Sequence, residues 1–578
     1  MSRTQNQHLK RHQFRRKLLL VCGLFGLYGC AIIAKLFYLQ VIQRSELVSR
    51  SERQYVRTVK IFYDRGKIFD RNGNEMAANL EMESIYVHPG EVSDKNYTAR
   101  VLSEILGKKF EDTLRKLKSR KSFVWIKRKV EPEKTDNLKR LDLNGVGFVS
   151  EQKRFYPKRE LASGLIGFVG LDNQGLAGVE HYRDSVLRGM TSLRIMEKDA
   201  LGRDIRPGSV RDDSKSAYDV TLTIDEVIQF IAEYELSLQV KKFSARAGLA
   251  IVMDPASGEI YAMANVPQFN PNRYRSYRPT SWRNPNVSNS YEPGSIFKPI
   301  VAAAVLESGD VGPNDIFFCE NGSYLVGSAR IGEASGHSFG WLSLAGIIQK
   351  SSNIGAIKIA EKLGKRRFYD SIRRFGFGKR TGIDLPGESV GQLRGLNGWS
   401  RLSASSISFG HEIGTTPVQM ITAISALANG GNLMHPIVTK NFVRGEEVIK
   451  KFKSVVATQV VSPKTSRQMV EIMKGVVQKG TGKGAAIPGY EVAGKTGTAQ
   501  KYDRKEKAYS NTAYMSSFVG FVPADSPRLA ILVMVDEPKK VYWGGDVAAP
   551  VFREIARRTL RYLNVPPRGE KVFILNPA

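Results

Sequence analysis

The chain begins with a polar, basic segment that is followed by a long apolar run. Residues 18–34 are apolar or small without interruption, and residues 36–42 extend the run beyond Lys35. About 20 such residues suffice for a helix to cross the hydrocarbon core of a bilayer, and a lysine near one end can reach the interface. The pattern therefore predicts one transmembrane helix over residues 18–42.

The charges before this run predict its orientation. Residues 1–17 contain no acidic residue, and their basic residues are Arg3, Lys10, Arg11, Arg15, Arg16 and Lys17. The positive-inside rule makes residues 1–17 a cytoplasmic tail and places the rest beyond the inner membrane, in the periplasm or extracytoplasmic space. After a cleaved signal peptide or a lipidated Cys30 the chain should turn polar, but it stays apolar as far as Leu39. We therefore expect an uncleaved, single-pass anchor.

Residues 43–215 are mixed, polar and basic, with short predicted elements. Residues 84–87 fit a strand, residues 102–117 have a helical pattern, and the Asn-Gly pair at 72–73 indicates a turn. No cluster of residues in this region suits a catalytic site. We expect an N-terminal pedestal domain of docking or dimerisation type.

Residues 216–566 have the pattern of one larger domain, before a C-terminal tail at 567–578. Residues 220–224 alternate threonine with aliphatic residues, and Asp225 is placed to cap the helix that follows. Two early and two late apolar segments predict strands, with helical stretches between them: residues 249–253, 260–264, 517–522 and 529–535. If these strands share one antiparallel sheet flanked by helices, the domain is of the α+β class.

Composition narrows the possible partners. The formal net charge is +31, but the basic residues are spread along the chain without the repeated basic-aromatic modules of nucleic-acid-binding proteins, so we expect no nucleic-acid partner. An anionic membrane surface or an anionic polymer remains compatible with this charge. The cysteines, Cys22, Cys30 and Cys319, have no spacing typical of a zinc site, a redox pair or a disulfide framework.

The first segment with candidate chemistry contains Ser295 and Lys298. An alanine-rich helical stretch follows, and Pro299 is tolerated only in the first turn of a helix, so Ser295 is expected at the helix start. There it meets free backbone N–H groups and lies on the same face as Lys298. A lysine with a lowered pKa can take the proton of a serine nucleophile. Alone, the Ser-x-x-Lys pattern is equally compatible with a solvated helix start.

Two weaker motifs follow. Ser351-Ser352-Asn353 lies between amphipathic stretches, where Ser351 is placed to relay a proton and Asn353 to hold an amide, although this tripeptide is usually a turn. Lys495-Thr496-Gly497-Thr498 lies in a small-residue segment.

Residues 489–496 also fit the phosphate-binding loop of NTPases, G-x-x-x-x-G-K-[ST]. The residues before Gly489 make a poor strand, and those after Thr496 have no helical period. The predicted orientation also places Lys495 away from cytoplasmic ATP. We therefore reject the NTPase interpretation.

The conjunction of motifs is more informative than any one of them. Ser-x-x-Lys, Ser-x-Asn and Lys-Thr-Gly occur in this order, with Ser351 56 residues after Ser295 and Lys495 144 residues after Ser351. This combination resembles the penicillin-binding proteins and serine β-lactamases. Further stretches resemble class B penicillin-binding proteins, namely residues 65–76, 154–157, 170–180, 480–482 and 542–552. In its length and its lack of an added C-terminal module, the chain is most similar to the division-specific peptidoglycan D,D-transpeptidase (penicillin-binding protein 3 type). An elongation-specific paralogue is the next most similar.

The resemblance implies a penicillin-binding, serine β-lactamase-like transpeptidase fold and a mechanism. Ser295 would attack the D-Ala-D-Ala carbonyl of a stem peptide, Lys298 would accept its proton, and Ser351 would pass it to the leaving amine. The backbone N–H groups of Ser295 and Thr498 would form the oxyanion hole. Lys495, Thr496 and Thr498 would hold the terminal carboxylate, and Gly497 would let the strand approach the substrate. Asn353, which is placed to hold an amide of the substrate, is the fourth residue expected in the catalytic group with Ser295, Lys298 and Ser351. No metal or organic cofactor is expected.

The same resemblance implies binding partners for the protein and leaves alternatives to the transpeptidase function open. β-Lactams would trap Ser295 covalently, and a glycan polymerase and other divisome membrane proteins are expected partners. Residues 409–414 depart from the glycine-rich stretch common in the family, and His411 within them is expected to be structural. A β-lactamase or a β-lactam sensor shares the three motifs, but the sequence identifies no extra carboxylate to activate water.

Overall fold

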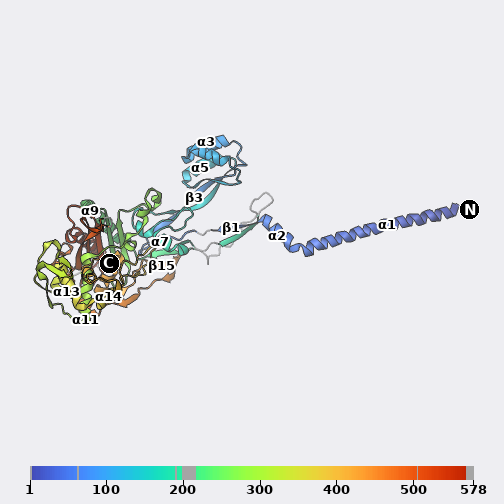
Figure 1. Ribbon diagram of the computed structural model, residues 1–578. Helices are drawn as coiled ribbons and strands as arrows, with labels where there is room; N and C mark the ends of the chain where they lie inside the picture. The colour runs from blue at the N-terminus through green and yellow to red at the C-terminus, as the bar shows by residue number, and fades with distance from the viewer. Residues whose placement is uncertain (1–2, 62–63, 189–191, 198–216, 504–505, 568–578) are drawn as a thin grey trace, which may run out of the picture. The chain divides into compact units, whose positions relative to one another are not determined.

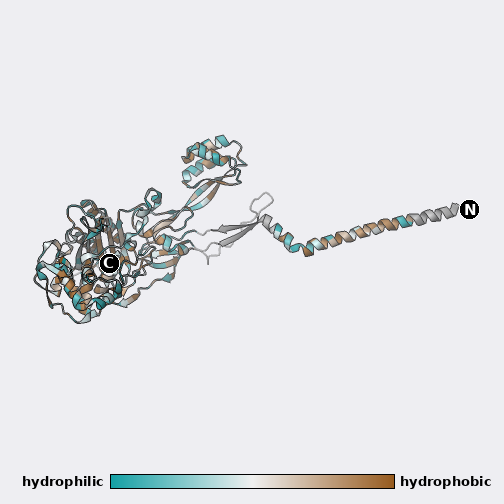
Figure 2. Ribbon diagram, in the orientation of Figure 1, coloured by the Kyte–Doolittle hydropathy of each residue, from teal (hydrophilic) through white to brown (hydrophobic). Residues whose placement is uncertain are grey.

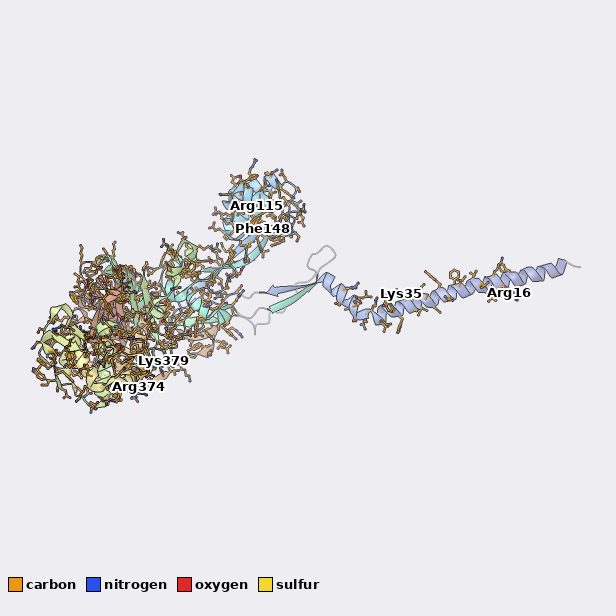
Figure 3. The ribbon with its side chains drawn as sticks, viewed as in Figure 1. Arg16, Lys35, Arg115, Phe148, Arg374 and Lys379 are labelled. Carbon is orange, nitrogen blue, oxygen red and sulfur yellow. The ribbon has the colours of Figure 1, made fainter. Side chains whose placement is uncertain are left out.

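The predicted anchor lies on the helix α1 (Arg3–Phe37), which continues as the short π-helix η1 (Tyr38–Ile42). Within the described part of the chain, Phe14–Ile42 is long and apolar enough to cross a membrane, and none of it is buried. Figure 2 shows the apolar residues along α1, and Figure 3 labels Arg16 and Lys35 near the two ends of the stretch. The apolar helix is confirmed, and it begins before residue 18 because the polar tail is helical too.

The structure is a computed structural model that describes residues 3–61, 64–188, 192–197, 217–503 and 506–567 (Figure 1). The chain divides into two units. The first contains α1, η1, α2 (Arg44–Tyr55) and an antiparallel ribbon of β1 (Val56–Ile61) and β6 (Ser192–Glu197). The predicted boundary at residue 215 and tail residues 568–578 lie outside the described residues, so the predicted domain limits stay predictions.

The second unit begins with a small α+β lobe, which we call the pedestal lobe. Its elements are β2 (Ile68–Phe69), β3 (Glu75–Val87), α3 (Lys95–Leu106), α4 (Phe110–Leu117), β4 (Val124–Val130), α5 (Pro132–Arg140) and β5 (Val146–Phe155). Gly107, in the left-handed conformation, ends α3 and divides the predicted helix of residues 102–117 in two. Phe148, labelled in Figure 3, packs against the separate core of this lobe.

A buried ion-pair network follows the pedestal lobe. After β5 the chain forms three short helices: α6 (Ser163–Ile166), α7 (Gly178–Tyr182) and α8 (Asp184–Arg188). Glu180 on α7 is fully buried and accepts hydrogen bonds from Arg65 Nε at 2.7 Å and Arg154 Nε at 2.6 Å. Their guanidinium groups hold the pKa of Glu180 below its usual value against the effect of burial. Three segments distant in sequence are thereby fixed together.

One mixed sheet joins the pedestal lobe to the larger domain. Its strand order is β16-β15-β7-β2-β3-β4, with β5 paired to β3, and β2 pairs in parallel with β7 (Asp219–Leu222). At the other edge of the sheet, β7 pairs with β15 (Thr439–Arg444), and β15 pairs with β16 (Glu447–Lys451). The two lobes of this unit therefore share backbone hydrogen bonds.

The larger domain is built on a five-stranded antiparallel sheet in the order β18-β19-β20-β8-β9. The strands are β8 (Ala247–Met253), β9 (Ile260–Val266), β18 (Ala493–Asp503), β19 (Ala508–Val522) and β20 (Leu529–Asp536). The prediction that early and late strands share one sheet is confirmed, as is the α+β class. Asp225 caps α9 (Glu226–Lys242) by accepting hydrogen bonds from two backbone N–H groups, as predicted.

Helices cover both faces of this sheet because alternate residues of each strand point to opposite sides. Ala250 and Val252 belong to the core shared with α9 and α19 (Ala549–Tyr562), whereas Ile251 and Met253 belong to the core on the other face. The helices of that second face are α11 (Lys298–Ser308), α12 (Leu344–Lys350), α13 (Asn353–Leu363), α14 (Lys365–Arg374), α15 (Ser403–Ser408), α16 (Pro417–Ala428) and α17 (Pro463–Gln478). The three motifs lie at the junction of this helical layer with β18.

Candidate active site

Ser295 lies on η5 (Gly294–Phe297), a 3-10 turn that leads directly into α11. Pro299 is in the first turn of α11, so the predicted helix start is correct to within one turn. Gly294 adopts a φ of 57° and donates its N–H to Gly410 O at 3.1 Å. A Cβ on Gly410 would lie 2.1 Å from Gly294 O. The two glycines therefore allow the close approach that fixes the Ser295 turn.

Lys298 is completely buried at the first position of α11. Its Nζ donates to Ser351 O at 2.6 Å and to Asn353 Oδ1 at 2.8 Å, and it lies 3.4 Å from Ser351 Oγ. Burial lowers the pKa of Lys298 to about 7, which places it where a general base works near neutral pH. Within the described part of the chain, the Ser295 hydroxyl makes no hydrogen bond, and Lys298 Nζ donates to Ser351 and Asn353 instead.

Ser351 lies between two lysines. It ends α12 in the left-handed conformation, with a φ of 61°, and its hydroxyl accepts a 2.9 Å hydrogen bond from Lys495 Nζ. Lys298 approaches the same hydroxyl from the first motif. A non-glycine residue at positive φ is strained, and such strain is common where a side chain must be aimed. The structure thus brings together the three motifs that the sequence singled out.

Lys495 lies on strand β18, near its beginning. It is fully buried, and besides Ser351 it donates to Thr496 O at 2.9 Å. Burial, and then the charge of Lys298, hold the pKa of Lys495 well below its ordinary value. Gly497 is explained by packing, because a Cβ there would lie 2.4 Å from Ser517 Oγ and 2.9 Å from Ile296 Cγ2. The absence of a side chain at Gly497 therefore lets β18 lie against the turn that carries the serine.

A cavity of about 450 Å³ opens onto these motifs. Ser295, Ser351, Thr496 and Thr498 line it, and Trp543 lies on its wall. Thr496 Oγ1 lies 2.6 Å from Thr481 Oγ1, and Thr498 Oγ1 accepts a 3.0 Å hydrogen bond from Gly544 N. Hydroxyl groups of β18 therefore line the cavity, whereas Lys495 is not among the described lining residues and donates to Ser351.

Glu333 is a residue of this site that the sequence analysis missed. It follows β12 (Ala329–Gly332), lines the cavity, and accepts hydrogen bonds from the Ser352 hydroxyl and from Asn353 N at 2.6 Å. Its charge also favours the protonated form of Lys298. Glu333 belongs to no recognisable motif, so only the tertiary fold reveals that it holds the Ser-x-Asn segment in place.

His411 is partly buried beside the site, where its ring contacts Phe409 and Tyr509 at centroid distances of 5.0 and 5.2 Å. Burial, with Lys298 nearby, lowers the pKa of His411 to about 4. The ring is therefore neutral at physiological pH, and its aromatic packing agrees with the expected structural role.

The geometry of the Lys-Thr-Gly segment excludes a phosphate-binding loop. Lys495 and Thr496 lie inside β18 and are paired in register with Val519 and Phe518 of β19. A phosphate-binding loop instead presents free backbone N–H groups before a helix. The rejection of the NTPase interpretation therefore agrees with the fold.

Comparison with known proteins identifies both lobes. Residues 248–557 match the penicillin-binding protein transpeptidase domain, and residues 60–222 match the penicillin-binding protein dimerisation domain. Stage V sporulation protein D of Bacillus subtilis is 36% identical over 569 residues, covering 96% of this chain and 87% of that protein. Peptidoglycan D,D-transpeptidase FtsI of Escherichia coli is 32% identical over 575 residues, covering 96% and 94%.

Solved structures agree with this assignment. A peptidoglycan synthetase from Bifidobacterium adolescentis superposes with a TM-score of 0.72 at 26% identity, covering 89% of this chain and 98% of that one. Penicillin-binding protein 3 from Mycobacterium tuberculosis, complexed with aztreonam, gives a TM-score of 0.68 at 27% identity, covering 88% and 98%. Together with the three convergent motifs, these matches show that the chain belongs to the class B penicillin-binding proteins.

Proposed function

We propose that the protein is a serine D,D-transpeptidase that cross-links peptidoglycan stem peptides ending in D-Ala-D-Ala. The single observation that carries the proposal is the convergence of Lys298, Ser351 and Lys495 beside the cavity that Ser295 lines. The relatives named as peptidoglycan D,D-transpeptidases support the same reaction.

In the first half-reaction, Ser295 Oγ attacks the carbonyl carbon of the penultimate D-alanine. Lys298 is buried and has a pKa of about 7, so its neutral amine can accept the hydroxyl proton. The new ester bond replaces the amide bond, and terminal D-alanine leaves with a proton delivered through Ser351. The backbone N–H groups of Ser295 and Thr498 stabilise the oxyanion, at about 3 kcal/mol for each donor.

In the second half-reaction, an amine of another stem peptide attacks the ester. A new peptide bond forms, the Ser295–acyl bond breaks, and the serine recovers its proton. Thr496 and Thr498 line the cavity, and we assign them direct contact with the substrate carboxylate, with Lys495 supporting them from behind. β-Lactams imitate the dipeptide and acylate Ser295 in the same way.

A hydrolytic β-lactamase is the main alternative chemistry. It needs a carboxylate that is free to activate water, and Glu333 is the carboxylate nearest the motifs among the cavity-lining residues. Both oxygens of Glu333 already accept hydrogen bonds, one from Ser352 and the other from Asn353 N. This engagement favours transpeptidation over rapid hydrolysis.

The cellular role that we propose is septal synthesis, with the chain anchored in the inner membrane and its catalytic domain in the periplasm or extracytoplasmic space. The relatives FtsI and stage V sporulation protein D support a role in cell division, and an elongation-specific role is the alternative. The apolar stretch Phe14–Ile42 supports the anchor. A glycan polymerase and other divisome membrane proteins are the proposed partners.

The proposed reaction is tested with the detergent-solubilised full chain, a D-Ala-D-Ala stem peptide and an amine acceptor. Mass spectrometry should find the cross-linked product together with released D-alanine, and Ser295→Ala should abolish both. Release of D-alanine without any cross-linked product, for every acceptor amine supplied, would contradict transpeptidation. Localisation of a fluorescent fusion to the sidewall rather than the septum would contradict the septal role.

A further inference from the structure

A second cavity, of about 340 Å³, lies where the pedestal lobe meets the larger domain. Its walls come from β4, β5 and the short helix η3 (Pro271–Ser276). The cationic side chains in its lining are Arg128, Lys129, Lys153, Arg154, Arg273 and Arg275, and no carboxylate-bearing residue is among the described residues that line it. None of the three catalytic motifs contributes to this cavity, which we call the basic cavity.

The most buried cation of the basic cavity is incompletely satisfied. Arg154 is 5% exposed, its Nε donates to Glu180, and its Nη1 donates to Asn79 Oδ1 at 3.0 Å. Its Nη2 is buried and has no hydrogen-bond acceptor within the described ranges. A buried N–H group without a partner is unfavourable and rare in native proteins, and a bound anion that reached Arg154 Nη2 would satisfy it.

Lys129 on the wall is in a similar position. Its Nζ donates to the neutral side-chain oxygen of Asn173 at 2.7 Å. Burial is the main reason that the pKa of Lys129 falls to about 8, and the charges of Arg128 and Lys153 add to it against the opposing charge of Glu151. Glu151 and Asp172 form ion pairs with Arg128 instead. Among the described residues, Lys129 is therefore a partly buried ammonium group without an anion of its own.

The rim of the basic cavity carries two further cationic side chains, Lys153 and Arg273. Asn272 binds the backbone of Tyr156 twice, accepting from its N–H at 3.0 Å and donating to its carbonyl at 2.9 Å. These contacts hold η3 beside the end of β5, so that Arg273 and Lys153 reach the same cavity. In the described part of the chain, neither Arg273 nor Lys153 forms an ion pair or a side-chain hydrogen bond.

We propose that the basic cavity binds a small, multiply charged phosphate anion, either free or as the phosphate end of a larger molecule. Guanidinium groups match the geometry of phosphate oxygens, and an ammonium group adds a point charge. Within the described ranges, the cavity's cations outnumber the carboxylates that pair with them, so an anion with two or more negative charges fits better than a single carboxylate. This site is separate from the acyl-serine chemistry and does not depend on the proposed function.

The probe is inorganic diphosphate, titrated calorimetrically into the full chain in detergent at constant ionic strength. Saturable binding with one site per chain is expected, and no binding would overturn the proposal. Glycerol phosphate is titrated in parallel, and binding by it assigns the site to esterified phosphate as well as to the free ion. Citrate is the third ligand, and tighter binding of citrate than of diphosphate would overturn the assignment to phosphate.

The double variant Lys153→Gln/Arg273→Gln tests the location. Both side chains are exposed and have no partners in the described part of the chain, so folding should be unchanged, which a melting curve checks. Losing two charged contacts should weaken diphosphate binding by about tenfold or more. The matched control, Arg100→Gln/Lys108→Gln, removes the same charge from exposed positions on and after α3 and should change binding less than about twofold. Equal weakening in both variants would show non-specific attraction and overturn the site.

Discussion

Lys495 Nζ lies 2.9 Å from Ser351 Oγ, so the third motif touches the second rather than the open cavity. Lys298 lies 3.4 Å from the same oxygen, and one hydroxyl therefore joins two buried lysines. Two ammonium groups this close to each other in a buried site disfavour one another's protonation. The charge of Lys298 adds to burial in lowering the pKa of Lys495, and the shared hydroxyl gives a short path along which a proton can move.

The rate of acylation by a β-lactam should depend on the protonation of Lys298. With a pKa of about 7, only its neutral form accepts the proton of Ser295, so the rate should rise with pH. The neutral fraction grows about tenfold between pH 6 and pH 8, and the second-order acylation rate should grow in proportion. Stopped-flow fluorescence with a labelled penicillin measures this profile. A rate that stays constant over that range would remove Lys298 from the role of base.

Ser351→Ala should disable the proton path without disturbing the fold. The variant removes the hydroxyl that joins Lys298 to Lys495, and we expect acylation to slow by about 10² to 10⁴. Ser343→Ala, which removes the hydroxyl that caps α12, is the matched control. It should cost about 1 kcal/mol of stability and leave the acylation rate within about threefold of the wild-type rate. Comparable slowing in the two variants would mean that Ser351 acts only through helix stability.

Gly410→Ala should disrupt the turn that carries the nucleophile. The new Cβ would lie 2.1 Å from Gly294 O, and Gly410 adopts a φ of 87°, which is unfavourable for alanine. We expect a loss of stability of about 1–3 kcal/mol, seen as a lower melting temperature, together with slower acylation. Gly395→Ala is the control because a Cβ there would have nothing within 4 Å of it. A Gly410→Ala protein that melts and acylates like the wild type would refute the close packing of this turn.

Glu180→Gln should destabilise the junction of the two lobes. Removing the charge leaves Arg65 and Arg154 buried without their shared carboxylate, at a cost of about 3–5 kcal/mol at neutral pH. The folded-state pKa of Glu180 is lowered, so its contribution is present above the ordinary carboxyl pKa and is lost as pH falls through the folded-state value. Urea unfolding at pH 7 and at acidic pH should therefore show the difference between variant and wild type shrinking in acid. A difference that is absent at pH 7 would contradict the network.

Much of this architecture was predictable because it depends on local pattern. The anchor, the cap at Asp225 and the pairing of early with late strands follow from apolar periodicity and turn chemistry. The family resemblance that the three motifs carry also implied that Ser295, Ser351 and Lys495 would lie at one site. Which atoms meet depends on tertiary packing, and no local signal specified it.

Glu333 shows the limit of sequence reasoning most clearly. It lies in a polar loop after a two-stranded hairpin, with no periodicity or motif to mark it, and yet it holds Ser352 and Asn353. The break in the predicted helix at Gly107 has the same origin, because a left-handed glycine ends α3 although the helical pattern continues. The pairing of Lys495 with Ser351 likewise required the three-dimensional arrangement.

The most direct test of the central claim is to locate the covalent adduct formed with benzylpenicillin. Intact-mass spectrometry of the full chain should show one adduct per chain, and peptide mapping should place it on Ser295. Ser295→Ala should remain unmodified under the same conditions. An unmodified wild-type chain, or an adduct on another residue that persists in Ser295→Ala, would contradict the account.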